Sequence, residues 1–170
     1  MKRLILASAA GALAVCSTLP AYAQSAVARL EPTKGNATGG SVTFTQKGDK
    51  VVVEAKVSGL TPGGHGFHIH EKGDCSSGDG MSAGGHFNPT GKPHGNPSVP
   101  DHHTGDLTML VADASGNVSL SMELDAMTIG SGATDIVGKS VIVHKDPDDY
   151  TTQPTGNSGA RVACGVIAKN

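Results

Sequence analysis

The sequence predicts an all-β fold, an eight-stranded antiparallel β-barrel or sandwich with two long functional loops. Apolar and polar residues alternate with a period of two at residues 41–45, 51–57 and 118–124, which is typical of strands with one buried face. Turn signals separate the segments, namely KGD at residues 47–49 and SGN at residues 115–117. After residue 23, no apolar pattern of helical period has a useful length.

Shorter strands are expected at residues 27–30, 67–70, 106–112, 140–144 and 162–167. Residues 71–105 and 145–161 lack periodicity and are rich in Gly, Pro, Ser and Asp. Loops of such length inside a compact domain usually have a function or are disordered. Because no internal repeat is visible, we expect a single domain after residue 23.

The first 23 residues have the features of a secretory signal peptide. Lys2 and Arg3 precede an apolar run at residues 4–15, which is shorter than the roughly 20 residues that span a bilayer. Ala21 and Ala23 supply the small residues of a cleavage site, so we expect cleavage after Ala23.

Cleavage would leave residues 24–170 as the mature domain, exported to the periplasm and free of the membrane. A lipid anchor at Cys16 is one alternative, although Val15 is a poor residue in front of a lipidated cysteine. Full secretion and an uncleaved membrane anchor are the others.

Charge and aromatic content argue against nucleic acid as a partner. The chain has a formal charge of −2, 3% aromatic residues and no Trp, so it offers neither a basic stripe for phosphates nor a platform for stacked bases. Two of the 13 Lys and Arg residues, but none of the 15 Asp and Glu residues, lie in the expected signal peptide. The mature domain would therefore carry a formal charge of −4.

Histidine is the informative residue type, with eight in the chain. In the segment FHIH at residues 67–70, Phe67 and Ile69 are expected to enter the core, while His68 and His70 project outward together from the other face. Two such imidazoles can grip a metal, and a pair of surface histidines is the alternative. The further histidines favour the metal site, and imidazole suits Zn, Cu, Fe or Ni rather than Ca or Mg.

Cys75 and Cys164 are the two cysteines that remain after cleavage, 89 positions apart. In an exported protein a disulfide is favoured over two thiols, and closing so long a loop would contribute about 4–5 kcal/mol in the chain-entropy treatment. Two zinc-binding thiolates are the alternative, but the chain has no CxxC spacing to support them.

Six motifs carry a resemblance to a known family. They are GFHIHE at residues 66–71, GHFNP at 85–89, KPHG at 92–95, HTGDL at 103–107, VHK at 143–145 and GNSGARVACG at 156–165. In this order they resemble the copper/zinc superoxide dismutase family, in its bacterial secreted (periplasmic) type. The resemblance covers about residues 27–167 and implies Greek-key connections between the strands.

The resemblance implies two metal cofactors, one copper and one zinc per subunit. The copper ligands that it implies are His68, His70, His86 and His144. The zinc ligands that it implies are His86, His94, His103 and Asp106, so that His86 bridges the two metals.

The resemblance also implies roles for residues that bind no metal. Arg161 matches the arginine beside the copper, Cys75 and Cys164 match the disulfide, and Asp148 matches an aspartate that links a copper ligand, His68, to a zinc ligand, His94. His65 and His102 match no ligand position, so hydrogen-bonding or solvated roles are expected for them.

The implied activity is the disproportionation of superoxide to hydrogen peroxide and dioxygen, an antioxidant defence outside the cytoplasm. Copper would be reduced and re-oxidised in turn, because zinc has no accessible second oxidation state. His86 would release the reduced copper, take up a proton and return it to the forming peroxide. Arg161 would attract and orient the anion. The sequence leaves open whether the protein is a monomer or a homodimer.

Some features depart from the family's patterns. The spacing of eleven between Cys75 and His86 is longer than in the common eukaryotic form, and Pro154 stands where many eukaryotic members carry a lysine. Three lysines are candidates to compensate in guiding the substrate: Lys72, Lys92 and Lys145.

Two other classes of function compete with the oxidoreductase. One is a binding module that holds zinc or hands copper on without turnover. The other is a zinc hydrolase with three histidines and a water, but a set of three histidines and an aspartate is closed, as structural zinc sites are.

Overall fold

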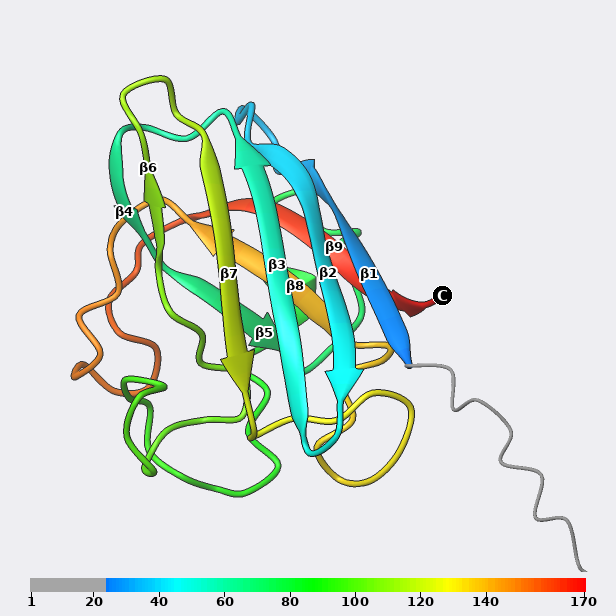
Figure 1. Cartoon of the computed structure of the whole chain (residues 1–170). Coiled ribbons are helices and arrows are strands. Elements are labelled where there is room, and N and C mark those ends of the chain that lie inside the picture. Colours follow the sequence, from blue (N-terminus) through cyan, green and yellow to red (C-terminus); the bar gives the residue numbers. More distant parts are fainter. Residues whose placement is uncertain (1–23) are drawn as a thin grey trace, which may run out of the picture.

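The computed structural model describes residues 24–170, so the expected signal peptide and its cleavage site lie outside the described residues. Within them the chain forms nine β-strands (Figure 1). The strands are β1 (Ser25–Pro32), β2 (Gly39–Lys47), β3 (Lys50–Ser58), β4 (Gly63–His65), β5 (Phe67–His70), β6 (Leu110–Ala112), β7 (Val118–Leu124), β8 (Ser140–His144) and β9 (Arg161–Lys169). A short 3₁₀ helix spans Met81–Ala83. In the described part of the chain no helix is long and apolar enough to cross a membrane.

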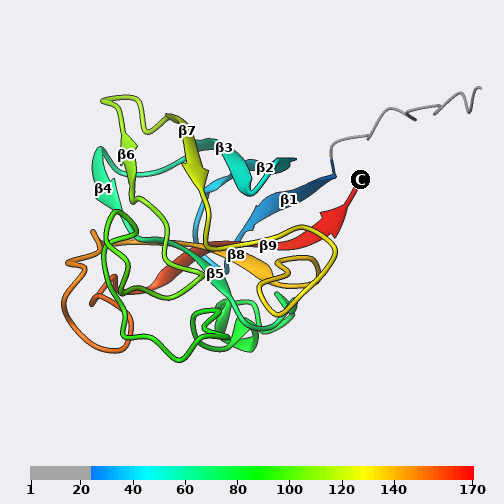
Figure 2. The ribbon, with the colours of Figure 1, turned by 60° about the horizontal axis from the view of Figure 1, so that its bottom comes forward.

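Seven strands form one antiparallel sheet in the order β5-β8-β9-β1-β2-β3-β7, and β4 pairs with β6 in a second, small sheet. β1, β2 and β3 follow one another as hairpins, whereas β9 returns from the far end of the chain to pair with β1. The sheet curls, so that β1, β2, β3 and β7 face β5, β8 and β9 across the interior (Figure 2). This curled antiparallel sheet confirms the prediction of an all-β Greek-key fold.

The structure has one strand more than expected, because no strand was predicted for β4, which Gly66 separates from the predicted β5. The amide of Gly66 donates to the carbonyl of Asp146 at 2.9 Å, and the amide of His144 donates to the carbonyl of Gly66 at 2.8 Å. A Cβ atom at Gly66 would lie 2.5 Å from Ser158 Oγ. The close approach of the loop after β8 therefore ends β4 and lets β5 begin in the other sheet.

The strand expected at residues 106–112 is shorter, since only Leu110–Ala112 forms β6. Asp106 instead forms an isolated bridge with His68 of β5. The backbone around Asp106 thus follows the edge of β5, which directs its carboxylate toward the histidines.

The interior of the curled sheet is filled by the apolar positions of the period-two pattern. In β3, Val53 and Ala55 are buried and Glu54 is exposed. Phe67 and Ile69 of β5 are fully buried in the same core, as predicted.

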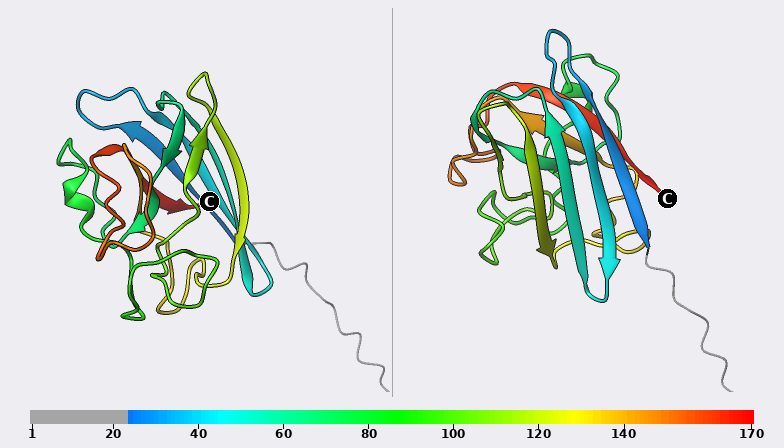
Figure 3. Two further views of the ribbon diagram at one scale, coloured as in Figure 1. Left: turned by 90° about the vertical axis from the view of Figure 1, so that its left-hand side faces the viewer. Right: turned by 45° about the horizontal axis from the view of Figure 1, so that its top comes forward.

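His68 and His70 lie on the other face of β5, but they do not project into solvent, because both are also 0% exposed. The two long loops cover this face: residues 71–105 (green) and 145–160 (orange) lie on the same side of the molecule, next to β5 and β8 (Figure 3).

The disulfide between Cys75 and Cys164 is present, with the two Cα atoms 5.8 Å apart. Cys164 lies in β9, the neighbour of β8 in the sheet, and it packs with Cys75, Ala83 and Ile142 in a small apolar cluster. The bridge therefore ties the long loop that follows β5 to the rigid part of the sheet.

We expect residues 24–170 to contain no free thiol, because the two cysteines of this part of the chain form the bridge, which closes a loop of large sequence separation. Thiol titration of the unfolded, unreduced chain from Gln24 onward measures this directly. The same chain after reduction serves as the control and should give two thiols. Two thiols without reduction would contradict the assignment.

Candidate metal centre

Two groups of buried side chains could each hold a metal ion. The first consists of His68, His70, His86 and His144, and the second of His86, His94, His103 and Asp106. In each group the ligand atoms all lie within 4.8 Å of one another. The structure thus brings together all seven side chains that the sequence resemblance implied as ligands, with His86 in both groups.

Backbone hydrogen bonds along the free edge of β5 set the position of these groups. The amide of Ile69 donates to the carbonyl of Gly105, the amide of Phe87 donates to the carbonyl of Ile69, and the amide of Gly105 donates to the carbonyl of Phe87, each at 2.8 Å. A Cβ atom at Gly105 would collide with the carbonyl oxygen of Ile69. Glycine at position 105 therefore allows two loop segments to pair along the free edge of β5. This pairing brings His86 and Asp106 beside the two histidines of the strand.

In the first group, four imidazole nitrogens are buried without a hydrogen-bond partner: Nδ1 of His68 and Nε2 of His70, His86 and His144. Leaving a buried polar atom unpaired costs about 1–3 kcal/mol. Four such atoms in one cluster therefore indicate a metal ion that uses them all.

After the ligands that the resemblance implied, the first group is called the copper side and the second group the zinc side. The other ring nitrogen of each copper-side histidine has a partner, which fixes the orientation of the ring. His70 Nδ1 donates to the carbonyl of Gly84 at 2.9 Å, and His144 Nδ1 donates to the carbonyl of Gly159 at 3.2 Å. His68 Nε2 bonds with a carboxylate oxygen of Asp148 at 2.6 Å. The unpaired nitrogens are thus directed toward one another.

In the second group, Asp106 Oδ1 lies 2.9 Å from His86 Nδ1, 3.0 Å from His94 Nδ1 and 3.4 Å from His103 Nδ1. Ligand atoms about 2.0–2.1 Å from a tetrahedral zinc stand roughly 3.3 Å apart, so the spacing fits that ion. The second oxygen of Asp106 accepts from the amides of Gly95 and His103 at 3.0 and 2.9 Å. The carboxylate is therefore held with one oxygen toward the three imidazoles.

Asp148 connects the two groups, as the resemblance implied. Its Oδ2 bonds with His68 Nε2 at 2.6 Å, and its Oδ1 bonds with His94 Nε2 at 3.0 Å. The amide of Tyr150 donates to the same Oδ1 at 2.7 Å. Gly156, at φ 68°, leaves room for this contact, because a Cβ atom there would collide with the carboxylate of Asp148.

Burial keeps the copper-side imidazoles neutral. It lowers the pKa of His86 to about 4 and that of His144 to about 3, and it holds the pKa of His70 well below the usual range. On the zinc side, burial opposes the charge of His94, but hydrogen bonds with Asp106 and Asp148 outweigh it and raise the pKa of His94 to about 9. Neutral imidazole is the form that binds metals, so the first group is ready to bind at neutral pH.

Arg161 lies at the start of β9, beside the first group. Its Nη1 donates to the carbonyl of Gly80 and its Nη2 to the carbonyl of Gly84, both at 2.7 Å. The carbonyl of Gly84 also accepts from His70. The same loop residue therefore positions a copper-side histidine and the arginine.

Asp149, an acidic residue of the loop that precedes β9, does not pair with Arg161. Asp149 accepts instead from the amides and hydroxyls of Thr151 and Thr152. Among residues 24–170, Arg161 forms no ion pair. Its guanidinium group is therefore held by carbonyl oxygens, which carry no net charge.

His65 and His102 are buried but belong to neither group. His65 donates from Nδ1 to the carbonyl of His144 at 2.9 Å, and its Nε2 lies 2.8 Å from the carbonyl of Thr61. His102 Nδ1 donates to the carbonyl of His103 at 2.6 Å. Both histidines thus contact the backbone of a neighbouring ligand.

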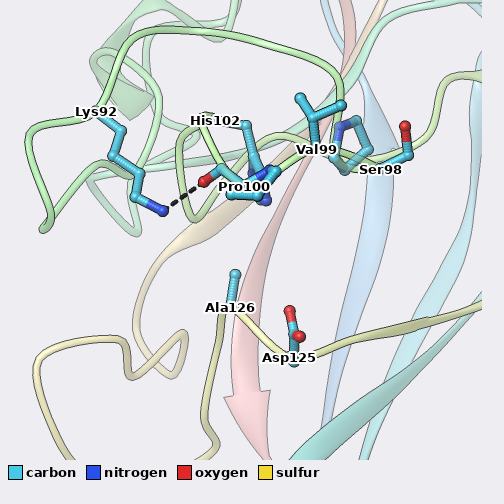
Figure 4. Close-up of a pocket in the computed structure, with 8 residues that line it drawn as sticks. Lys92, Ser98, Val99, Pro100, His102, Asp125 and Ala126 are labelled. Atoms are coloured by element: carbon cyan, nitrogen blue, oxygen red, sulfur yellow. Dashed lines mark hydrogen bonds between the residues drawn. The ribbon is translucent and has the colours of Figure 1, made fainter.

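Lys92, one of three lysines proposed to guide a substrate, has a partner in its own loop. Its Nζ donates to the carbonyl of Pro100, at the wall of a cavity of about 390 Å³ that faces Asp125 and Ala126 (Figure 4). This hydrogen bond joins two parts of the loop in which Lys92 lies. A guiding role for Lys92, Lys72 or Lys145 stays a prediction.

Comparison with known proteins agrees with this geometry. The family model described as copper/zinc superoxide dismutase (SODC) matches residues 38–167. The chain belongs to this family. A crystal structure of the clock protein EA4 is 42% identical to it, with a TM-score of 0.78, over 85% of this chain and 93% of that chain. The two groups are thus a copper-like and a zinc-like site, and the bacterial secreted type stays a prediction.

Asp148→Asn should weaken zinc binding by about 10–100-fold, because a carboxylate that orients ligating imidazoles typically contributes that much. Competition with a chelator at neutral pH measures the affinity. Asp149→Asn is the matched control, since within residues 24–170 its carboxylate accepts side-chain and backbone hydrogen bonds only from Thr151 and Thr152. Equal zinc affinity of Asp148→Asn and the unchanged protein would show that Asp148 does not support the site.

Proposed function

We propose that this member of the copper/zinc superoxide dismutase family is an active enzyme, an oxidoreductase that disproportionates superoxide with one copper and one zinc ion per subunit. The observation that carries the proposal is that His86 belongs to both ligand groups. A side chain shared in this way couples a site for a redox metal to a site for a fixed charge.

The residues present fit both metals. His68, His70, His86 and His144 would hold the copper, and His86, His94, His103 and Asp106 would hold the zinc. When bound, copper supplies one-electron chemistry, while zinc supplies positive charge without redox activity.

His86 can serve both groups only when neither ring nitrogen carries a proton. Positive charge on the zinc side favours this deprotonated ring. Its Nε2 faces the copper-side histidines without a hydrogen-bond partner. Nε2 of His86 is therefore the atom that can take up a proton and give it to the product.

Arg161 provides the positive charge that an anionic substrate needs. The mature domain has a formal charge of −4, so the net field repels superoxide, and a local cation matters more than the net value. The two carbonyls that hold the guanidinium fix its position without neutralising it.

The site geometry does not favour the two other functions. A zinc hydrolase needs an open coordination position, whereas the zinc-like group already offers four protein ligands. A module that only stores metal needs no arginine positioned beside the copper-side histidines.

We also propose that the protein acts in the periplasm, without partners in nucleic acid or membrane, as a monomer or a homodimer. The signal-peptide features of residues 1–23 and the disulfide support an oxidising compartment. N-terminal sequencing of exported protein should give Gln24 as the first residue. A chain that begins at a lipidated Cys16 would contradict this proposal.

The metal-loaded protein should consume superoxide rapidly, and Arg161→Ala should slow it without removing either metal. The effect should be larger at low ionic strength, because salt screens charges beyond about 10 Å at 0.1 M. Arg161→Glu should be slower still, since it repels the anion. The rate is measured against salt concentration.

Copper and zinc contents of each variant are the control for this experiment. Full metal contents with the unchanged rate at every salt concentration would show that Arg161 does not guide the substrate. An unchanged protein that holds one copper and one zinc but consumes no superoxide would contradict the proposed function itself.

A further inference from the structure

The loop between Cys75 and His86 carries an acidic residue next to the backbone that holds Arg161. Asp79 is exposed, and its Oδ1 accepts from the amide of Met81 at 2.9 Å. This bond forms a tight turn over Gly80, which adopts φ 76°. The carboxylate of Asp79 is thus fixed at the surface of the loop.

The same turn packs directly on the arginine. The carbonyl of Gly80 accepts from Arg161 Nη1 at 2.7 Å. A Cβ atom at Gly80 would lie 3.3 Å from both Cβ and Cδ of Arg161. Asp79 therefore precedes the residue that covers the arginine side chain and binds its guanidinium.

The charges of Asp79 and Arg161 influence each other. Hydrogen bonds from the amide of Met81 and from Ser77 lower the pKa of Asp79, and attraction to Arg161 adds to this effect. Burial lowers the pKa of Arg161, and Asp79 opposes that shift. The two groups form no ion pair in the described chain, so the carboxylate leaves the guanidinium free while it reduces the positive potential around it.

We propose that Asp79 weakens the attraction of small anions to Arg161 and the copper-side histidines, because its negative charge opposes the field of Arg161. Its effect on turnover rests on the proposed function, whereas its effect on anion binding does not. Because the effect is one of charge, it applies to any small anion that approaches the copper through Arg161.

The test compares the copper- and zinc-loaded protein with Asp79→Asn. Asparagine keeps a carbonyl oxygen that can accept from the amide of Met81, so the turn is preserved while the charge is lost. The affinity for azide, a small anion that binds copper, is titrated by visible absorption. At low ionic strength Asp79→Asn should bind azide roughly two- to threefold more tightly and consume superoxide faster by a similar factor. Both differences should shrink at high salt.

Two further variants separate the local charge from other causes. Asp74→Asn removes the same charge from the same loop and the same kind of turn, since Asp74 Oδ1 accepts from the amide of Ser76 at 2.8 Å, and it should behave as the unchanged protein. Asp79→Glu retains the charge and should also do so.

The outcomes are distinct. Azide affinity of Asp79→Asn equal to that of the unchanged protein at low salt, an equal gain in Asp74→Asn, or a gain in Asp79→Glu as large as in Asp79→Asn would each overturn the inference. A gain confined to Asp79→Asn in a protein that consumes no superoxide would support the role of Asp79 in anion binding and refute the proposed function alone.

Discussion

The hydrogen-bonded edge of β5 is the constraint on which both metal-like sites depend. Because His86 belongs to both ligand groups, neither site can be placed independently of the other. The three backbone hydrogen bonds that join Ile69, Phe87 and Gly105 in a ring fix the register of three segments at once. A slip of one residue in that register would turn His86 or Asp106 away from the partners that they need.

The site combines ionised carboxylates with unpaired imidazole nitrogens, as expected of a centre that binds metal. Asp106 and Asp148 are ionised, since hydrogen bonds from histidines overcome their burial and hold both pKa values well below the usual range. Four unpaired imidazole nitrogens lie on the copper side. Metal binding would satisfy these atoms, so part of its free energy becomes free energy of folding.

The strands and the ligand side chains could be predicted from the sequence, because both depend on local pattern or on residue type. The period of two placed Phe67 and Ile69 in the core, and the family motifs named the seven ligand residues. Backbone acceptors carry no such signal. The bonds of Arg161 with Gly84 and Gly80 span 77 and 81 positions, and the break at Gly66 depends on contact with Ser158. Likewise, the full burial of His68 and His70 comes from loops without periodicity.

The way in which Arg161 is held has a consequence for its charge. A carboxylate partner would fix the guanidinium as well as a carbonyl does, but it would also cancel the field that an anion senses. Carbonyl oxygens carry only partial charge, so they orient the group and leave its net charge intact. The disulfide contributes to this arrangement. It anchors the loop that contains both carbonyls to β9, the strand that begins at Arg161. The long loop thus positions a cation at the copper-side histidines, which a chain of net negative charge would otherwise lack.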